Sequence, residues 1–397
     1  MRRSELVVAL LGLALSLGGC GGGGGGESTP PTNNVQPISV DAGPAGTLNL
    51  AFTSVTVCAP GSSTNCQTID HIQVDTGSSG LRLISSVLSP ALSLPQQIDA
   101  NGNPLIECAQ FADGFSWGPV KLADVRIAGE QANSLPVQII GDTAFSSIPS
   151  SCSSAGPPEN TVQTFGANGL LGVGVFLQDC GRGCAQFLIP GTYYGCPPSG
   201  CSPTQVAVSQ QLQNPVGLFS GDNNGVIVEF PSIAAAGVAT VAGSLIFGIG
   251  TQTNNGMGTA TILATDPNTG NIVTVFKNQS FANSYIDSGS NVFFIGTGLY
   301  PMCTGTAKGF YCPATTQNLS ATLQGANNNA SAATFSIANA EQLFAANPSF
   351  YAFNNVAAPA GDPSVFAWGL PFFYGRNVYI AIETKQTPGG TGPYFAF

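Results

Sequence analysis

The sequence predicts an all-β protein with two lobes, and three observations support this prediction. Short apolar runs alternate with turns rich in Gly, Pro, Asn and Ser, as strands and turns do in all-β proteins. One pattern occurs twice, far apart: an apolar strand that leads into Asp, a hydroxyl residue and Gly. About 350 residues follow an export signal, which is more than a single core usually holds, so two lobes that meet near residue 235 are expected.

The expected strands are short and far outnumber the helices. Helical patterns are confined to residues 338–346, where Leu343 and Phe344 suit one face of a short helix, and to residues 232–238, which suit a turn or two. The expected strands cover residues 48–57, 71–74, 81–84, 121–127, 136–140, 225–230, 244–248, 272–276, 292–295 and 378–382.

The chain begins with the features of an export signal. Arg2 and Arg3 precede an apolar run over residues 6–17, which is too short to span a bilayer comfortably. Residues 17–20 (LGGC) resemble the bacterial lipobox, which implies cleavage before Cys20 and a lipid on its thiol. An ordinary signal peptide with a chance Cys is the alternative.

We therefore expect a lipoprotein signal peptide over residues 1–19. The lipidated Cys20 and a Gly/Pro-rich tether would follow over residues 20–46. The lipid would attach the protein to a membrane, and Gly21 rather than Asp after it favours the outer membrane by analogy with Gram-negative sorting. The expected location is the bacterial cell envelope, at the outer membrane or the periplasmic face.

The composition is that of a globular exported protein and excludes several functions. Apolar residues make up 43 % of the chain, enough for a large core, while charged residues make up only 8 %. The net charge of −10 argues against a nucleic-acid partner, because phosphate binding needs a basic patch. His71 is the single histidine, which excludes histidine-rich metal sites and argues against Ser–His–Asp or Cys–His catalysis.

The cysteine count predicts disulfides. Eleven Cys leave ten besides Cys20, and ten allow five bridges in an oxidising compartment. Sequence alone leaves the connectivity open, and a zinc site among the four Cys of residues 180–201 is an alternative. The plausible pairs are Cys58 with Cys66, Cys303 with Cys312, two nested bridges among Cys180, Cys184, Cys196 and Cys201, and Cys108 with Cys152.

The repeated pattern places one carboxylate at the end of each of two strands. The first copy is residues 72–81 (IQVDTGSSGL) with Asp75, and the second is residues 284–294 (SYIDSGSNVFF) with Asp287. A single Asp–Thr–Gly or Asp–Ser–Gly most often marks only a solvated turn. Two copies indicate two matching half-sites, with each Gly permitting a tight turn.

A second marker follows each copy, at residues 167–174 (ANGLLGVG) and 366–373 (FAWGLPFF). This order resembles the pepsin-like aspartic proteases, in which an apolar–apolar–Gly segment is threaded beside the D-T/S-G loop of each lobe. Residues 50–61, 243–248 and 376–383 are similar to that family's first hairpin, the segment that opens its second lobe, and its last strand. More narrowly, the string DTGSSGLRL resembles a bacterial branch, the DUF3443 family.

The resemblance implies the pepsin-like acid protease fold and a mechanism. Two β-barrel lobes of six-stranded type would cover residues 47–235 and 236–397, with a cleft between them. There Asp75 and Asp287 would share one proton and activate a water that hydrolyses a peptide bond. This implies a monomeric aspartic endopeptidase that acts on a peptide or protein substrate without a metal or organic cofactor.

The resemblance also assigns roles to the neighbouring residues, position by position. Thr76 and Ser288 would tie the two loops together through their hydroxyls. Ser78 and Ser290 would bond the outer carboxylate oxygens, while Gly77 and Gly289 would give backbone amides room to approach.

The chain departs from the family pattern at its expected flap, residues 108–118 (CAQFADGFSWG). Phe111 stands where the active family has Tyr, before Asp113 and Gly114 of the turn. Arg82 stands where a Trp is expected; a cation there would favour the charged dyad and could bind an anionic ligand group, or it could form a structural ion pair or lie exposed. A second function therefore stays open: a lipid-anchored binding or inhibitory module that keeps the fold without the activity.

Overall fold

A closed barrel of six strands contains the first of the two Asp motifs. The computed structural model describes residues 33–296 and 298–397, and these are mostly β-strand, so the predicted all-β class is confirmed at that level. The expected signal peptide, Cys20 and residues 21–32 of the expected tether lie outside the described residues. Neighbouring strands follow the order β6 (Phe115–Ile127), β7 (Glu130–Ile140), β4 (Ser79–Ile84), β8 (Gly169–Val173), β3 (Cys66–Asp75) and β2 (Ala51–Cys58), after which β2 pairs again with β6.

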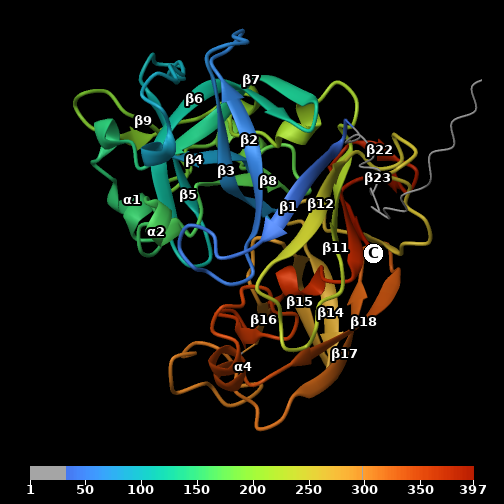
Figure 1. The fold of residues 1–397 in the computed structure, drawn as a ribbon. Coiled ribbons are helices and arrows are strands. Elements are labelled where there is room, and N and C mark those ends of the chain that lie inside the picture. The colour runs from blue at the N-terminus through green and yellow to red at the C-terminus, as the bar shows by residue number, and fades with distance from the viewer. Residues whose placement is uncertain (1–32, 297) are drawn as a thin grey trace, which may run out of the picture. The chain divides into compact units, whose positions relative to one another are not determined.

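The sheet continues beyond this barrel on both sides. Strand β12 (Val241–Phe247), from the second half of the chain, thereby lies two strands away from β2, with β1 (Val35–Val40) between them (Figure 1). On one side lie β5 (Leu105–Gln110), β9 (Tyr193–Gly195) and β10 (Ser202–Pro203); on the other lie β1 (Val35–Val40), β12 (Val241–Phe247), β11 (Gly225–Phe230), β21 (Arg376–Ala381), β24 (Tyr394–Ala396) and β13 (Ile262–Ala264).

Strand β1 corrects the predicted extent of the tether. It lies within residues 20–46, yet it pairs with β12 from Val35 to Val40 and with β2 at its end. Ile38 and Val40 alternate with more exposed residues and are buried in the core, which is the two-residue period of a strand. The folded part therefore begins before residue 47, and residues 33–397 form one compact unit. The predicted boundary near residue 235 falls in a strand-free segment between β11 and β12 and stays a prediction as a domain limit.

A second sheet holds the second Asp motif and forms a half-barrel. Aromatic side chains fill its core: the rings of Phe366 and Trp368 stack with centroids 4.4 Å apart, and Phe335 packs edge-on against both. Its strand order is β18 (Ala330–Ile337), β17 (Gln317–Gln324), β14 (Ile272–Phe276), β15 (Gln279–Ile286), β20 (Phe366–Trp368), β16 (Phe293–Ile295) and β19 (Ala357–Pro359); β22 (Gln386–Thr387) and β23 (Gly390–Thr391) form a separate hairpin.

Helices are few and short. The predicted helix at residues 338–346 is observed as α4 (Ala340–Ala346), whose first turn is capped by the side chain of Asn339. Residues 232–238 form a hydrogen-bonded turn rather than a helix. The others are α1 (Ser150–Ser153), α2 (Val162–Phe165), α3 (Arg182–Gln186) and the 3-10 helices η1 (Ser85–Val87), η2 (Thr143–Phe145), η3 (Val208–Gln210), η4 (Pro215–Leu218) and η5 (Leu370–Phe372).

Five disulfides join the ten cysteines of the described residues. They place the protein in an oxidising, extracytoplasmic compartment. The expected nested pairing is wrong, because the four Cys of residues 180–201 pair with their nearest neighbours in the chain; the zinc alternative is wrong because none of these sulfurs is a free thiol. The bridges are Cys58–Cys66, Cys108–Cys152, Cys180–Cys184, Cys196–Cys201 and Cys303–Cys312.

Membrane-spanning helices and metal-binding clusters are both absent from the described part of the chain. No helix there is long and apolar enough to cross a membrane. No group of three or more His, Cys, Asp or Glu side chains there is placed to hold a metal ion.

Candidate active site

The two Asp motifs occupy equivalent positions in the two sheets. Strand β3 ends at Asp75 and β15 ends just before Asp287. Strand β8 pairs in parallel with β3 and antiparallel with β4. It therefore lies between the two strands that precede and follow the first loop. β20 has the same relation to β15 and β16 around the second loop. The sequence repeat is thus a repeat of local topology.

Glycine is required where the inserted segment passes each loop. A methyl group on Gly172 of β8 would stand 2.8 Å from Ser78 Oγ, and one on Gly369 would stand 2.5 Å from the backbone oxygen of Ser290. Neither position tolerates a side chain without displacing the Asp loop. This is the physical reason for the Gly in both apolar–apolar–Gly segments.

Each loop holds its own carboxylate in the same way. The backbone N–H of Gly77 donates to Asp75 Oδ1 over 2.7 Å, and the Ser78 hydroxyl donates to Asp75 Oδ2. In the second loop, Gly289 N–H donates to Asp287 Oδ1 and the Ser290 hydroxyl to Asp287 Oδ2, both over 2.7 Å. One oxygen of each carboxylate is therefore fixed by the backbone and the other by a hydroxyl.

Thr76 and Ser288 bind the two loops to each other through four hydrogen bonds. Thr76 N–H donates to Ser288 Oγ over 3.2 Å, and Ser288 N–H donates to Thr76 Oγ1 over 2.9 Å. The Ser288 hydroxyl donates to the backbone oxygen of Val74, and the Thr76 hydroxyl donates to that of Ile286. All these groups are buried, so the relative position of the loops is set by a fully paired polar network.

This network brings the carboxyl groups of Asp75 and Asp287 face to face. A methyl group on Gly289 would stand 2.5 Å from Asp75 Oδ1, and one on Gly77 would stand 2.8 Å from Asp287 Oδ1. The two residues are only 6 % and 8 % exposed. Burial raises the pKa of Asp287 well above its usual value, and the charge of Asp75 and a hydrogen bond with it add to this rise. Asp287 therefore keeps its proton to a higher pH than an ordinary carboxyl group does.

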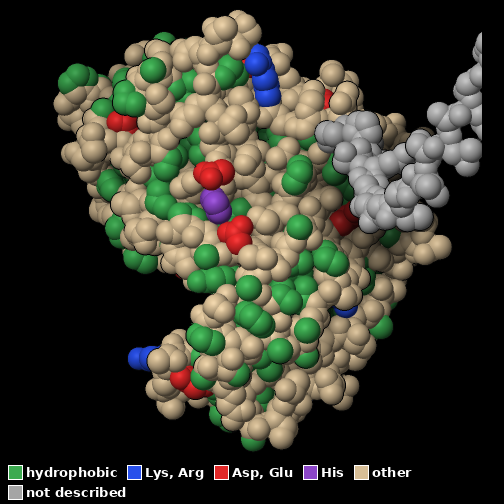
Figure 2. Space-filling model, in the orientation of Figure 1, with side chains coloured by type: hydrophobic (Ala, Val, Ile, Leu, Met, Phe, Trp, Pro, Cys, Tyr) green, Lys and Arg blue, Asp and Glu red, His purple; other side chains and the backbone are tan. Residues whose placement is uncertain are grey.

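Two cavities, of about 640 and 630 Å³, meet at the carboxyl pair. Both are lined by Asp75, Asp287, Tyr285 and Phe111, so they form one groove that passes on either side of the pair. The space-filling view is hollowed on the side where α2 and β16 lie, and residues of both elements line the second cavity (Figure 2). Each of the two cavities has a volume within the range of ligand-binding pockets in proteins.

The hairpin of β5 and β6 borders both cavities with its turn. Phe111 N–H donates to Gly114 O across that turn, and Phe111 packs edge-on against Phe165 of α2. A methyl group on Gly114 would stand 2.5 Å from the Pro157 backbone oxygen. Asp113 is exposed at the tip. The expected flap segment thus lies beside the carboxyl pair with an aromatic ring but no hydroxyl at residue 111.

Arg82 forms a buried ion pair, one of the alternatives raised from the sequence. Its guanidinium donates to Glu107 Oε1 over 2.6 Å and lies 3.6 Å from Asp179 Oδ2. It also donates to the Ser79 backbone oxygen. The side chain is 4 % exposed, so the alternative of an exposed strand residue is wrong.

Sequence reasoning missed four side chains of the groove. Tyr285 lies on β15, two residues before Asp287, and strand periodicity could have indicated its position beside the pair. Burial, followed by the charges of Asp287 and Asp75, raises its pKa to about 12, so its hydroxyl stays protonated. Glu107, Asp179 and Tyr193 carry no local signal, because only the folding of distant segments brings them together.

His71 lies away from the groove. Its Nε2 lies 3.4 Å from Asp41 Oδ1 and its Nδ1 lies 3.2 Å from Asp70 Oδ2, and the side chain is partly exposed. It lines neither cavity. A histidine-dependent nucleophile in the groove therefore has no base among the described residues.

These features define a disulfide-bonded, mostly β protein of an extracytoplasmic compartment, with a buried carboxyl pair in a groove. The family model described as "Protein of unknown function (DUF3443)" matches residues 30–397. The chain belongs to the DUF3443 family. No curated protein matches it.

Proposed function

We propose that the protein is an aspartic endopeptidase with a pepsin-like bilobal arrangement, acting on peptides or proteins in the cell envelope. The observation that carries the proposal is the matched placement of Asp75 and Asp287. Each is held by an equivalent loop, and the two share a proton at the centre of a groove open on both sides. A solvated surface turn would not need a Gly at the point where each loop contacts the carboxylate of the other loop.

The geometry suits hydrolysis by general acid–base catalysis. Asp287 holds the proton, and Asp75 accepts one from a water that attacks the peptide carbonyl carbon. The proton on Asp287 hydrogen-bonds the carbonyl oxygen as negative charge develops on it. The tetrahedral intermediate then collapses, the C–N bond breaks, and the leaving nitrogen takes the proton that Asp75 received. Ser78 and Ser290 keep the two carboxylates oriented through these steps.

The test is cleavage of a diverse peptide library by the disulfide-intact protein between about pH 3 and pH 7, with and without pepstatin. Asp75→Asn and Asp287→Asn preserve shape but remove the shared proton, so cleavage is expected to fall about 10²–10⁴-fold in each. Asp142→Asn is the matched control, because Asp142 pairs with Lys121 and lines neither cavity. Cleavage that survives both dyad substitutions would overturn the mechanism.

The absence of cleavage by folded wild-type protein would favour the non-catalytic binding or inhibitory module. One observation points in that direction: residue 111 in the flap segment is Phe, which offers no hydroxyl to a ligand. The same library then serves as a binding assay, with immobilised protein and peptides identified by mass spectrometry. Peptide binding without turnover would establish that alternative.

The proposed attachment to a membrane through a lipid on Cys20 is tested separately. Cys20→Ser is expected to move the protein from the membrane fraction to the soluble periplasmic fraction and to abolish incorporation of labelled fatty acid. An unchanged fractionation would mean that Cys20 is not the anchor.

A further inference from the structure

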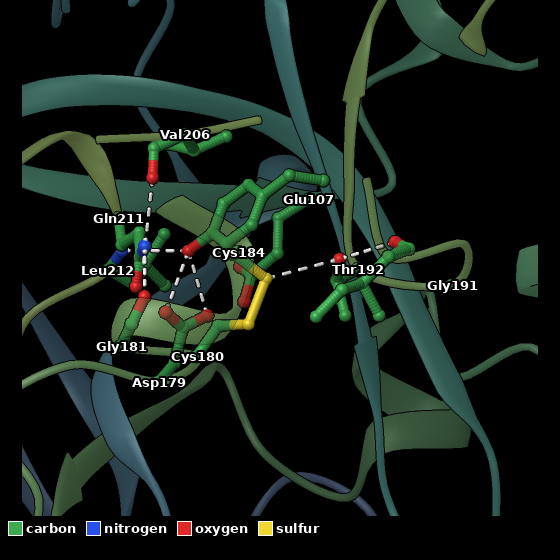
Figure 3. Close-up of a disulfide and its surroundings, with 12 residues drawn as sticks. Glu107, Asp179, Cys180, Gly181, Cys184, Gly191, Thr192, Val206, Gln211 and Leu212 are labelled. Carbon is green, nitrogen blue, oxygen red and sulfur yellow. Dashed lines mark hydrogen bonds between the residues drawn. A yellow bond between two sulfur atoms is a disulfide. The ribbon is translucent and has the colours of Figure 1, made fainter. Parts of the chain in front are cut away.

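Beside the carboxyl pair, the first cavity is lined by a second group of ionisable side chains that the proposed mechanism does not use. These are Arg82, Glu107, Asp179 and Tyr193, which we call the Arg82 cluster. Glu107 belongs to β5 of the hairpin that borders the groove, and Asp179 precedes the Cys180–Cys184 disulfide. Figure 3 shows Asp179 next to this disulfide. The Tyr193 hydroxyl donates its proton to the Asp179 carboxylate and lies 2.8 Å from both Oδ1 and Oδ2.

The cluster contains one more acid than base. The Arg82 guanidinium serves both Glu107 and Asp179, at 2.6 and 3.6 Å, and no other Lys or Arg lines this cavity. Glu107 is 1 % exposed, and its Oε2 has no hydrogen-bond partner among the described residues. Arg82 Nε likewise has none. A buried carboxylate without a counter-ion is costly, so the excess negative charge favours uptake of a proton by the cluster.

Asp179 is the group that takes this proton. Burial raises the pKa of Asp179 well above its usual value; the charge of Glu107 and a hydrogen bond with it raise it further, while Arg82 opposes the rise. A proton on Asp179 would give Glu107 Oε2, the oxygen that Arg82 does not bind, a hydrogen-bond donor. Its side chain is 13 % exposed, the most of the three charged members, so Asp179 is the one open to the cavity.

A ligand cation would replace that proton. An ammonium or guanidinium brings both the positive charge and the donors that two ionised acids require. An anion would be repelled by the two carboxylates. It could not take Arg82 Nη2 as a free donor either, because Nη2 already donates to Glu107. An apolar side chain would bring neither charge nor donors, so Asp179 would have to keep its proton.

We propose that the Arg82 cluster is a specificity pocket for a Lys or Arg side chain of the substrate, close to the bond held at Asp75 and Asp287. This inference rests on the proposed endopeptidase function. Tyr193 positions Asp179 in the pocket, and its hydroxyl is itself fixed by the N–H of Leu212 over 2.8 Å. The pocket needs Asp179 ionised, so the preference for a cation strengthens as pH rises and falls as Asp179 takes up its proton.

The experiment compares peptide pairs that differ only by Lys or norleucine, which share an apolar stem, at each position around the cleaved bond. At one position, kcat/KM of the wild type is expected to favour Lys at least about tenfold. Asp179→Asn keeps an oxygen acceptor for Tyr193 but removes the charge, and should reduce the ratio of kcat/KM for the Lys and norleucine peptides to about one. Asp142→Asn should leave the ratio unchanged.

Two further measurements keep the outcome unambiguous. Near-UV circular dichroism of Asp179→Asn should match the wild type; if that variant is misfolded, Glu107→Gln makes the same test. Equal rates for Lys and norleucine at every position in folded wild type would overturn the pocket while leaving the endopeptidase standing.

Failure of the proposed function gives a different result. If folded wild type cuts no peptide, fluorescence anisotropy measures binding of the same labelled pairs. Tighter binding of the Lys peptide that is lost in Asp179→Asn would support the pocket in a non-catalytic protein. Equal binding of both peptides would overturn it.

Discussion

The α-carbon of Gly289 faces the carboxylate of Asp75 so closely that a methyl group at residue 289 would stand 2.5 Å from Oδ1. In the same way, a methyl group on Gly77 would stand 2.8 Å from Asp287 Oδ1. Real Cβ atoms do not approach other atoms so closely. The third position of each motif, residue 77 or 289, must therefore be Gly, because a side chain there would collide with the carboxylate of the other loop.

Gly289→Ala is expected to separate the two acids. Overpacking of this kind typically costs about 1–3 kcal/mol of unfolding free energy, and displacement of the Asp75 carboxylate would lower cleavage at least about 100-fold. Gly256→Ala is the control, because a methyl group there meets no atom within 4 Å. Chemical denaturation and peptide cleavage measure the two effects. Full activity of folded Gly289→Ala would show that the carboxyl groups need not lie this close.

Removal of the buried hydroxyls that join the loops is expected to destabilise the fold. Thr76→Val leaves the N–H of Ser288 without an acceptor, and Ser288→Ala leaves the N–H of Thr76 without one. Each should cost about 1–3 kcal/mol in urea unfolding, with non-additive effects in the double variant. Thr56→Val, at an exposed hydroxyl pair, should stay within about 0.5 kcal/mol of wild type. Additive single effects would contradict a shared network.

The Cys108–Cys152 disulfide is expected to contribute more stability than Cys196–Cys201. It joins the hairpin beside the groove to α1 across a sequence separation of 44, against 5 for the other bridge. Loop-closure entropy predicts a loss of about 4 kcal/mol when the first pair becomes Ala and about 2 kcal/mol for the second. Guanidinium unfolding of the two double-Ala proteins measures both, and the opposite order would show that native packing, not chain entropy, dominates.

Glu159, next to the hairpin turn, is expected to make stability depend on pH. Burial raises its pKa from 4.5 to about 7, and the charge of Asp113 and a hydrogen bond with it contribute. The folded state thus binds this proton more tightly than the unfolded state does. The corresponding stability is complete below about pH 4.5 and is lost as pH rises to about 7. Glu159→Gln should therefore lose less stability than wild type between these pH values.

Glu341 provides a control of opposite sign. A hydrogen bond from the Ala307 N–H, together with bonds from Thr306, lowers its pKa, so its contribution is present at higher pH and lost as pH falls. Glu341→Gln should lose less stability on acidification than wild type. Thermal unfolding across pH 3 to 8 measures both variants. Parallel curves for Glu159→Gln and wild type would contradict a raised pKa at Glu159.

The local features of the fold were largely predictable. Strands β11 and β14 match the expected ranges of residues 225–230 and 272–276, because their apolar periodicity and flanking turns are local properties. Strand β1 was missed because Pro37 and short, polar flanks suit a tether as well as a strand. Only its pairing with β12 and β2, which no local pattern encodes, distinguishes the two.

For the candidate site, local sequence motifs were enough to predict the two Asp loops with their hydroxyl and Gly neighbours, and strand periodicity was enough to predict the mostly β character. These follow from short motifs whose conformational requirements are local. Only the tertiary structure decided which cysteines of residues 180–201 are bonded, what pairs with Arg82, and that Glu107 and Asp179 join it in the groove. The reason is physical: an ion pair or a disulfide depends on distance in space, and segments far apart in the chain approach only when the sheets that carry them close.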